Sequence, residues 1–227
     1  PETFDEYRNM LYNLRETVTE ERRDKKRKKR DSRRKRREEQ TRLRNRLIDA
    51  FPKWRDAARD HQMIYMHIGD PNSGKTHDAL EALKAAGSGW YLAPLRLLAY
   101  EIFDRLNDAG VKCSLLTGEE YIPVDGAQIT AATIEMFNPV ASGECVVIDE
   151  AQMLADADRG WAWTRAMMES KAPEMHMIGP PTVRILIEVL ASAAEISYEV
   201  VEHKRLTPIR VAEKHLTLES LPDHTIL

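Results

Sequence analysis

Cysteine is scarce in this sequence of 227 residues, and long apolar runs and a strong net charge are missing. The two cysteines, Cys113 and Cys145, have neither the spacing of metal ligands nor the number of a disulfide framework, so they fit a reducing compartment. No apolar stretch is long enough to span a membrane as a helix, which predicts that the chain has no membrane partner. The N-terminal residues lack the apolar core of a secretory signal, and Glu2, Asp5 and Glu6 disfavour a mitochondrial presequence.

The net charge of -3 is the sum of a basic N-terminal part and an acidic remainder of the chain. Residues 1–46 contain 18 Lys and Arg against 10 Asp and Glu, whereas residues 47–227 contain 16 against 27. Basic residues fill 13 of the 16 positions in 22–37, and neither Gly nor Pro interrupts residues 2–51. We therefore expect residues 1–51 to form a basic arm, helical or partly disordered. Such an arm suits the phosphate backbone of a nucleic acid, although a merely solvated extension or a nuclear-localisation signal has the same composition.

Beyond Pro52, apolar runs of strand length alternate with apolar residues at helical spacing. Strands are expected at 63–68, 89–93, 114–117, 128–132, 145–148, 175–178 and 197–201, and helices at 75–85, 95–107, 160–169 and 182–193. This alternation predicts an α/β domain over residues 52–227, with a mostly parallel sheet and helices on both faces. Ligands of such sheets bind at the carboxyl ends of the strands.

A phosphate-binding loop is predicted between the first strand and the first helix of this domain. The stretch from Gly69 to Thr76, Gly-Asp-Pro-Asn-Ser-Gly-Lys-Thr, fits the pattern of Gly, four residues, Gly-Lys-Ser/Thr. Backbone N–H groups and a helix N-terminus can surround a polyphosphate there, which a chance glycine-rich turn would not do. The residues expected to bind the nucleotide are Gly69, Asn72, Ser73, Gly74, Lys75 and Thr76. Lys75 would reach the β- and γ-phosphates, and the Thr76 hydroxyl would hold a magnesium ion.

A second motif, Asp149-Glu-Ala-Gln152, directly follows an expected buried strand. If the chain is a phosphate-loop ATPase, Asp149 would hold the magnesium ion and Glu150 would polarise the attacking water. Two adjacent carboxylates are also common on protein surfaces, so the motif gains its meaning from the phosphate loop in the same sheet. An Asp-Glu-x-x element at this place is typical of nucleic-acid helicases of the second superfamily.

Five further stretches occur in an order that resembles one helicase family. They are Pro94-Leu-Arg-Leu-Leu-Ala99, Thr117-Gly-Glu-Glu120, Asp149-Glu-Ala-Gln-Met153, Arg159-Gly-Trp-Ala-Trp-Thr-Arg165 and Lys204-Arg-Leu-Thr-Pro208. Together with the phosphate loop they resemble the ATP-dependent RNA helicases of the mitochondrial degradosome and their bacterial relatives. The resemblance covers about residues 52–220 and does not extend to the arm.

The resemblance implies a RecA-like fold and an ATP-binding motor domain that couples hydrolysis to strand translocation or unwinding. It implies ATP and Mg2+ as cofactors, and catalytic roles for Lys75, Asp149, Glu150 and Gln152, of which Gln152 would relay the nucleotide state. The residues implied beside the RNA backbone are Arg96, Thr117, Gly118 and Thr133.

The resemblance also implies partners and a location. The expected partner is RNA, single-stranded or structured, or else DNA, and an exoribonuclease is a further expected partner. A bacterial cytoplasm is expected, with the mitochondrial matrix as the alternative. Helicases of this superfamily hydrolyse ATP between two similar domains, and residues 52–227 match the first of them, so we expect a second motor domain outside this chain.

Some aromatic and histidine residues are expected to have structural roles. We expect Trp161 and Trp163 to pack beside the sheet, as an alternative to stacking on bases. His67 and His176 lie inside expected strands and are interpreted as hydrogen-bonded core residues. Met167, Met168, Met175 and Met177 are expected to fill the core.

Two other function classes remain open. A phosphate-loop kinase would use the same nucleotide loop, but it would not usually place Asp-Glu-x-Gln after a strand. A non-catalytic module that binds nucleic acid or a protein partner would not need Lys75, Thr76, Asp149 and Glu150 together.

The basic arm generates a first prediction. Deleting residues 1–46 should weaken binding to single-stranded RNA strongly at low salt, because the rest of the chain is acidic. If the arm contacts about five or six phosphates, the log affinity of the intact chain falls with log salt at a slope of roughly −4, and the truncated chain gives a flatter slope. Titration at several salt concentrations measures both, with nucleotide affinity as the unchanged control. Equal affinities and equal slopes would show that the arm does not bind RNA.

Overall fold

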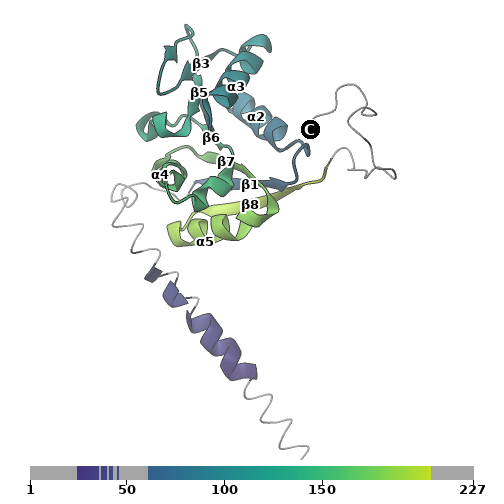
Figure 1. Cartoon of the computed structure of the whole chain (residues 1–227), viewed down its shortest axis with the longest axis vertical. Coiled ribbons are helices and arrows are strands. Elements are labelled where there is room, and N and C mark those ends of the chain that lie inside the picture. The colour runs from purple at the N-terminus through teal and green to yellow at the C-terminus, as the bar shows by residue number, and fades with distance from the viewer. Residues whose placement is uncertain (1–24, 36, 40, 43–44, 46–60, 206–227) are drawn as a thin grey trace, which may run out of the picture.

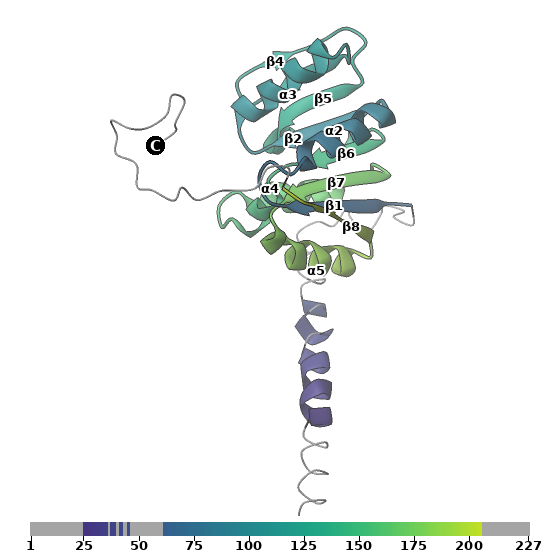
Figure 2. The same cartoon turned by 90° about the vertical axis from the view of Figure 1, so that its right-hand side faces the viewer.

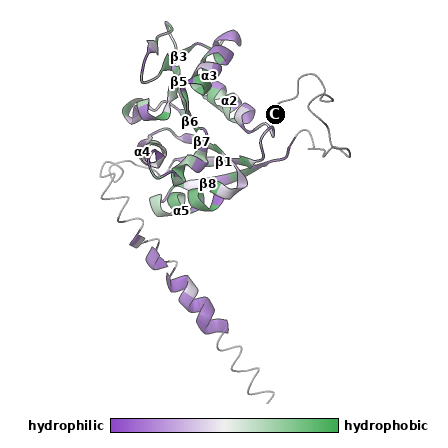
Figure 3. Cartoon of the chain, in the orientation of Figure 1, coloured by the Kyte–Doolittle hydropathy of each residue, from purple (hydrophilic) through white to green (hydrophobic). Residues whose placement is uncertain are grey.

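The computed structural model describes residues 25–35, 37–39, 41–42, 45 and 61–205 (Figure 1). The described residues before 46 are all helical, as expected for the arm, and all but Asp31 are exposed. They are strongly hydrophilic, in contrast to the sheet domain (Figure 3). The expected boundary at residue 52 and most of the Lys204–Pro208 stretch lie outside the described residues.

The domain is built on one sheet of eight strands. The strands are β1 (Met63–Gly69), β2 (Gly89–Ala93), β3 (Cys113–Leu116), β4 (Tyr121–Ile122), β5 (Ile129–Thr133), β6 (Cys145–Ile148), β7 (Glu174–Gly179) and β8 (Ser197–His203). Their order is β4-β3-β5-β2-β6-β7-β1-β8, and every neighbouring pair is parallel except β3 with β4. The predicted mostly parallel sheet is therefore confirmed.

Helices cover both faces of the sheet, which confirms the predicted layers (Figure 2). The helices are α2 (Lys75–Ala86), α3 (Arg96–Asp108), α4 (Gly160–Glu169) and α5 (Arg184–Ala194), with short 3₁₀ turns at Ile134–Met136, Pro139–Ala141, Ala151–Ala155 and Pro181–Val183. Helices α2 and α3 share one hydrophobic cluster, and α4 and α5 share the other. Strand side chains alternate between the two: Val146 and Ile148 belong to the α4–α5 cluster and Val147 to the α2–α3 cluster.

Most expected elements agree with the structure to within one or two residues at each end, and the main differences are one added strand and the start of the last helix. Strand β4 was not predicted, because two residues are too short to show any periodicity. It pairs antiparallel with Leu115 and Leu116 of β3. The last helix begins at Arg184 because Pro181 opens a 3₁₀ turn before it. In the described part of the chain, no helix is long and apolar enough to cross a membrane.

The predicted core methionines and histidines are buried, as expected. Met167, Met168, Met175 and Met177 all belong to the cluster beneath α4 and α5. His67 and His176 join across β1 and β7 through a 2.8 Å hydrogen bond between His67 Nε2 and His176 Nδ1. Burial, together with the neighbouring imidazoles of His176 and His203, lowers the pKa of His67 to about 4.

Candidate active site

The carboxyl ends of three adjacent strands form the candidate active site. Because β6, β7 and β1 are parallel neighbours, the segments that follow them meet at one edge of the sheet. They enclose a cavity of about 360 Å³. Its lining residues are Gly69, Pro71, Asn72, Ser73, Gly74, Lys75, Thr76, His77, Asp149, Glu150, Gln152, Ile178, Gly179 and Pro180. The structure thus brings together every residue predicted for the nucleotide and for catalysis.

The phosphate loop has the backbone conformation of a tight turn before a helix. Asn72 and Gly74 have left-handed φ angles of 59° and 88°, a conformation that glycine adopts without strain. The Ser73 hydroxyl donates to the Asp70 carbonyl at 2.7 Å and closes the turn. Gly74 is the N-cap of α2, and no side chain caps this helix N-terminus. The first turn of α2 is therefore able to present its N–H groups and its positive dipole to an anion.

The Lys75 ammonium lies folded back over the loop. Its Nζ donates to the carbonyls of Gly69 at 2.7 Å and Asp70 at 2.6 Å. Burial lowers the pKa of Lys75, while the carboxylates of Glu150, Asp70 and Asp149 oppose that shift. The side chain thus places a positive charge between the loop and the two carboxylates at the end of β6, where a polyphosphate could bind it.

Asp149 has a buried carboxylate, and three hydrogen bonds hold the residue in place. The Tyr91 hydroxyl on β2 donates to Oδ2 at 2.6 Å, and the Glu150 N–H donates to Oδ1 at 2.8 Å. The Trp163 indole of α4 donates to the Asp149 carbonyl at 2.9 Å. Burial raises the pKa of Asp149, and the hydrogen bond from Tyr91 opposes the rise. The ionised form is thus costly in the folded chain, and a cation bound beside it would offset that cost.

Glu150 and Gln152 connect the end of β6 to the end of β7. Glu150 has a left-handed φ of 49°, which costs a non-glycine residue about 1 kcal/mol or more. The Gln152 amide donates to the Glu150 carboxylate. The other amide atom, Oε1, is buried without a hydrogen-bond partner among the described residues. A Cβ placed on Gly179, the last residue of β7, would lie 3.5 Å from it, so Gln152 reaches the end of β7.

The residues predicted beside RNA lie at the carboxyl ends of β2, β3 and β5. Arg96 begins α3 and forms an ion pair with Glu119. The buried Thr117 hydroxyl accepts the Glu120 N–H at 3.2 Å, so it stabilises its own turn. Gly118 is exposed beside it, whereas Thr133 is buried. Arg96 and Gly118 are therefore the members of this set that face solvent.

Comparison with known proteins gives the family. The family model for the DEXQ-box helicase domain of Suv3 matches residues 48–203. The chain belongs to this family. The Suv3-type domain is 45% identical over 175 residues to the mitochondrial ATP-dependent RNA helicase SUPV3L1 of Mus musculus, covering 75% of this chain and 22% of that protein. It is 43% identical over 164 residues to the mitochondrial ATP-dependent RNA helicase SUV3L of Oryza sativa, covering 72% and 22%.

The chain thus spans about a fifth of the length of these curated relatives. Among solved structures, a hypothetical ATP-dependent RNA helicase from Sulfolobus tokodaii is similar over 65% of this chain and 50% of that chain, with a TM-score of 0.48 and 16% identity.

An arginine that the sequence analysis did not single out joins three segments of the Suv3-type domain. Arg159, at the N-cap of α4, donates from Nε and Nη2 to Glu135 Oε1 at 3.0 and 2.7 Å. Its Nη2 also donates to the Pro94 carbonyl at 2.7 Å, and its guanidinium lies 5.5 Å from the Trp163 ring centre. Arg159 therefore fixes α4 against the segments that follow β2 and β5. Arg159 and Pro94 both lie within stretches named in the sequence, but only the fold reveals that they meet.

The two tryptophans of α4 have different environments. Trp163 is fully buried, as predicted, but Trp161 is 52% exposed, so its predicted packing was wrong. Two steps along a helix turn the side-chain direction by about 200° around the helix axis, so residues 161 and 163 lie on nearly opposite faces. Only one of the two indoles can therefore face the sheet.

The Arg159–Glu135 pair generates a second prediction. In a double-mutant cycle with Arg159→Gln and Glu135→Gln, we expect a coupling free energy of about 1 kcal/mol, because two N–H groups of the guanidinium donate to the Glu135 carboxylate. The control is the Arg165–Glu169 pair one turn apart on α4, for which we expect about 0.3 to 0.5 kcal/mol. Denaturant unfolding measures both. A coupling no larger than that of the control pair would mean that Arg159 does not fix α4 through Glu135.

Proposed function

We propose that this chain contains the first motor domain of an ATP-dependent RNA helicase. Residues 52–227 would bind ATP and couple its hydrolysis to translocation along, or unwinding of, a nucleic-acid strand, and residues 1–51 would form a basic arm. The observation that carries the proposal is the cavity lined both by Lys75 and Thr76 of the loop and by Asp149 and Glu150, which follow β6.

The residues of the cavity fit ATP with Mg2+. The loop from Gly69 to Gly74 would surround the phosphates with N–H groups, and Lys75 would exchange its carbonyl partners for phosphate oxygens. The Thr76 hydroxyl and the Asp149 carboxylate provide the oxygen donors that Mg2+ prefers. Mg2+ would neutralise charge on the transferred phosphoryl group.

Glu150 is proposed to orient and polarise the attacking water. Its carboxylate follows Asp149 directly and lines the same cavity. Gln152, hydrogen-bonded to Glu150 and next to Gly179, would relay the state of the nucleotide to the segment after β7. None of the described residues that line the cavity is an arginine. We therefore propose that the arginines needed for phosphoryl transfer come from a second motor domain.

RNA is the proposed substrate, because the relatives are named RNA helicases. Arg96 and Gly118 would contact its backbone directly, Thr117 would hold the adjoining turn, Thr133 would lie beside them at the end of β5, and the arm would add sequence-independent affinity. DNA would satisfy the same phosphate contacts. An exoribonuclease partner is proposed from the family resemblance alone. The relatives are named mitochondrial, so we propose the mitochondrial matrix in place of the bacterial cytoplasm expected first.

Replacing Glu150 by Gln generates the third prediction and tests the catalytic role. In the full-length protein, Glu150→Gln should retain ATP binding and lose RNA-stimulated turnover by about 100-fold or more, since only water activation requires the carboxylate. Glu101→Gln, at an exposed position of α3, is the control and should hydrolyse ATP normally. ATPase assays with and without RNA measure this.

The same assays separate the alternatives. Normal turnover in Glu150→Gln would exclude Glu150 as the base. Turnover of the unaltered protein that requires a small-molecule acceptor would indicate a kinase. Absence of any turnover with RNA would indicate a binding module.

A further inference from the structure

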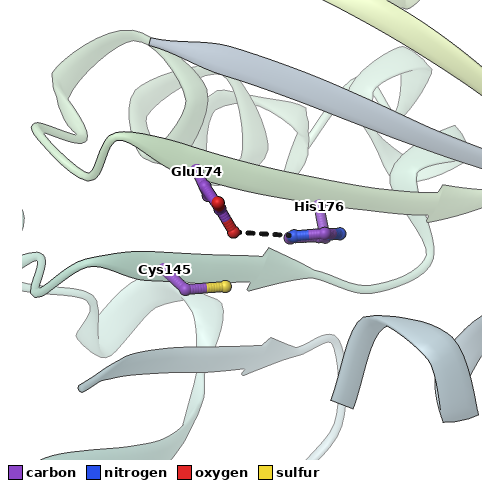
Figure 4. A group of neighbouring side chains, drawn as sticks. All are labelled: Cys145, Glu174 and His176. Carbon is purple, nitrogen blue, oxygen red and sulfur yellow. Dashed lines mark ion pairs between the residues drawn. The ribbon is translucent and has the colours of Figure 1, made fainter. Parts of the chain in front are cut away.

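A second cluster of chemically active side chains lies toward the amino ends of β6 and β7, whereas the phosphate loop follows the carboxyl end of β1. Cys145 is the first residue of β6 and Glu174 the first of β7, and these two residues are register partners. His176 lies two residues further along β7, on the same face. The thiol sulfur, a carboxylate oxygen and an imidazole nitrogen all lie within 4.8 Å of one another (Figure 4).

His176 presents to this cluster a nitrogen that makes no hydrogen bond and whose contact with Glu174 is the ion pair drawn in Figure 4. The residue is only 5% exposed, and its Nε2 has no hydrogen-bond partner among the described residues. The nearest carboxylate oxygen, Oε2 of Glu174, lies 3.7 Å from Nε2, which is too far for a hydrogen bond. A buried polar atom without a partner is costly, so a ligand that accepts the Nε2 lone pair would stabilise this arrangement.

A chain of imidazoles leads from His176 back to the first turn of α2. His67 bonds through Nε2 to His176 Nδ1 at 2.8 Å and through Nδ1 to His203 Nε2 at 2.9 Å. His203 Nδ1 lies 3.7 Å from the Asp78 carboxylate. If each ring donates through Nδ1 in the direction of Asp78, both hydrogen bonds between imidazoles are satisfied, and the lone pair of His176 Nε2 points toward Cys145 and Glu174. A donated second ring N–H is the usual support of a metal-binding histidine.

We propose that Cys145, Glu174 and His176 bind one divalent transition-metal ion of the Zn2+ class. One sulfur, one oxygen and one nitrogen donor form a ligand set that suits Zn2+, and three protein ligands leave a fourth position for water. The proposal does not depend on the nucleotide site. The sequence could not reveal it, because the ligands come from two strands and match no local spacing motif.

Glu174 gives this site access to solvent. Its side chain is 48% exposed. It lines a cavity of about 350 Å³ with Pro173, Glu144 and three alanines of α2, Ala82, Ala85 and Ala86. Small side chains on this part of α2 leave room for an ion to enter. Binding requires the Glu174 and Cys145 side chains to turn so that their donor atoms, now within 4.8 Å of one another, reach the metal–ligand distances of about 2.0 to 2.3 Å that Zn2+ adopts.

Coordination requires the Cys145 thiol to lose its proton. Burial raises the pKa of this thiol to about 12, so the thiol is neutral before the ion binds. The sulfur–hydrogen bond is replaced by a sulfur–metal bond, and the proton passes to the buffer.

A metal titration of the full chain tests the proposal as the fourth prediction. Zn2+ should bind in a 1:1 ratio in competition with a chromophoric chelator, with excess Mg2+ present to occupy the phosphate-loop site. Cys145→Ser and His176→Gln should each weaken Zn2+ binding by about 10-fold or more, and His67→Gln, which acts through His176, by about 10-fold. Cys113→Ser is the matched control, since Cys113 is also buried but lies outside the cluster. The affinity of the Cys113→Ser variant for Zn2+ should equal that of the unaltered chain.

Cobalt substitution identifies the ligand directly. Co2+ should show a thiolate-to-metal charge-transfer band in the unaltered chain and in Cys113→Ser, and no such band in Cys145→Ser. Glu174→Gln, at a half-exposed position, keeps the test valid if the core variants fail to fold, and should also weaken Zn2+ binding. No 1:1 binding, or unchanged affinity in Glu174→Gln with the cobalt band absent, would overturn the proposal.

Discussion

The buried carboxylate of Asp149 is the constraint on which the candidate active site depends. Three hydrogen bonds hold this residue: Tyr91 of β2 and the Glu150 N–H donate to its carboxylate, and Trp163 of α4 donates to its carbonyl. Burial alone disfavours the charged carboxylate and raises its pKa. The site offsets this with hydrogen bonds, with the nearby Lys75 ammonium and, in the proposed function, with a magnesium ion. A carboxylate that is costly without a cation is suited to binding one.

Local patterns in the sequence predicted most of the fold and the nucleotide cavity. Strands with buried apolar runs, the loop before α2 and the acidic pair after β6 are all encoded in short stretches. Since parallel strands share a carboxyl edge, the sequence also predicted that Lys75 and Asp149 would meet. These features need no knowledge of contacts between distant residues.

The contacts that the sequence did not predict join residues far apart in the chain. Tyr91 donates to Asp149 across neighbouring strands, and Arg159 pairs with Glu135 from another segment. The chain of His203, His67 and His176 crosses three strands. Strand order decides each of these pairs, and no local spacing reveals strand order. Trp161 was wrongly predicted to pack because the direction of a side chain around a helix depends on which face meets the sheet.

The central claim is that the loop and the carboxylates form one site for a magnesium–nucleotide complex, with Lys75 as its cation for phosphate. Titration calorimetry with a non-hydrolysable ATP analogue and Mg2+ tests this most directly, comparing the unaltered chain with Lys75→Ala, and circular dichroism verifies that both are folded. The account predicts that the unaltered chain binds the analogue and that the folded variant shows no measurable binding, because Lys75 is half-buried beside the cavity and is not a core residue. An unchanged affinity in Lys75→Ala would contradict it.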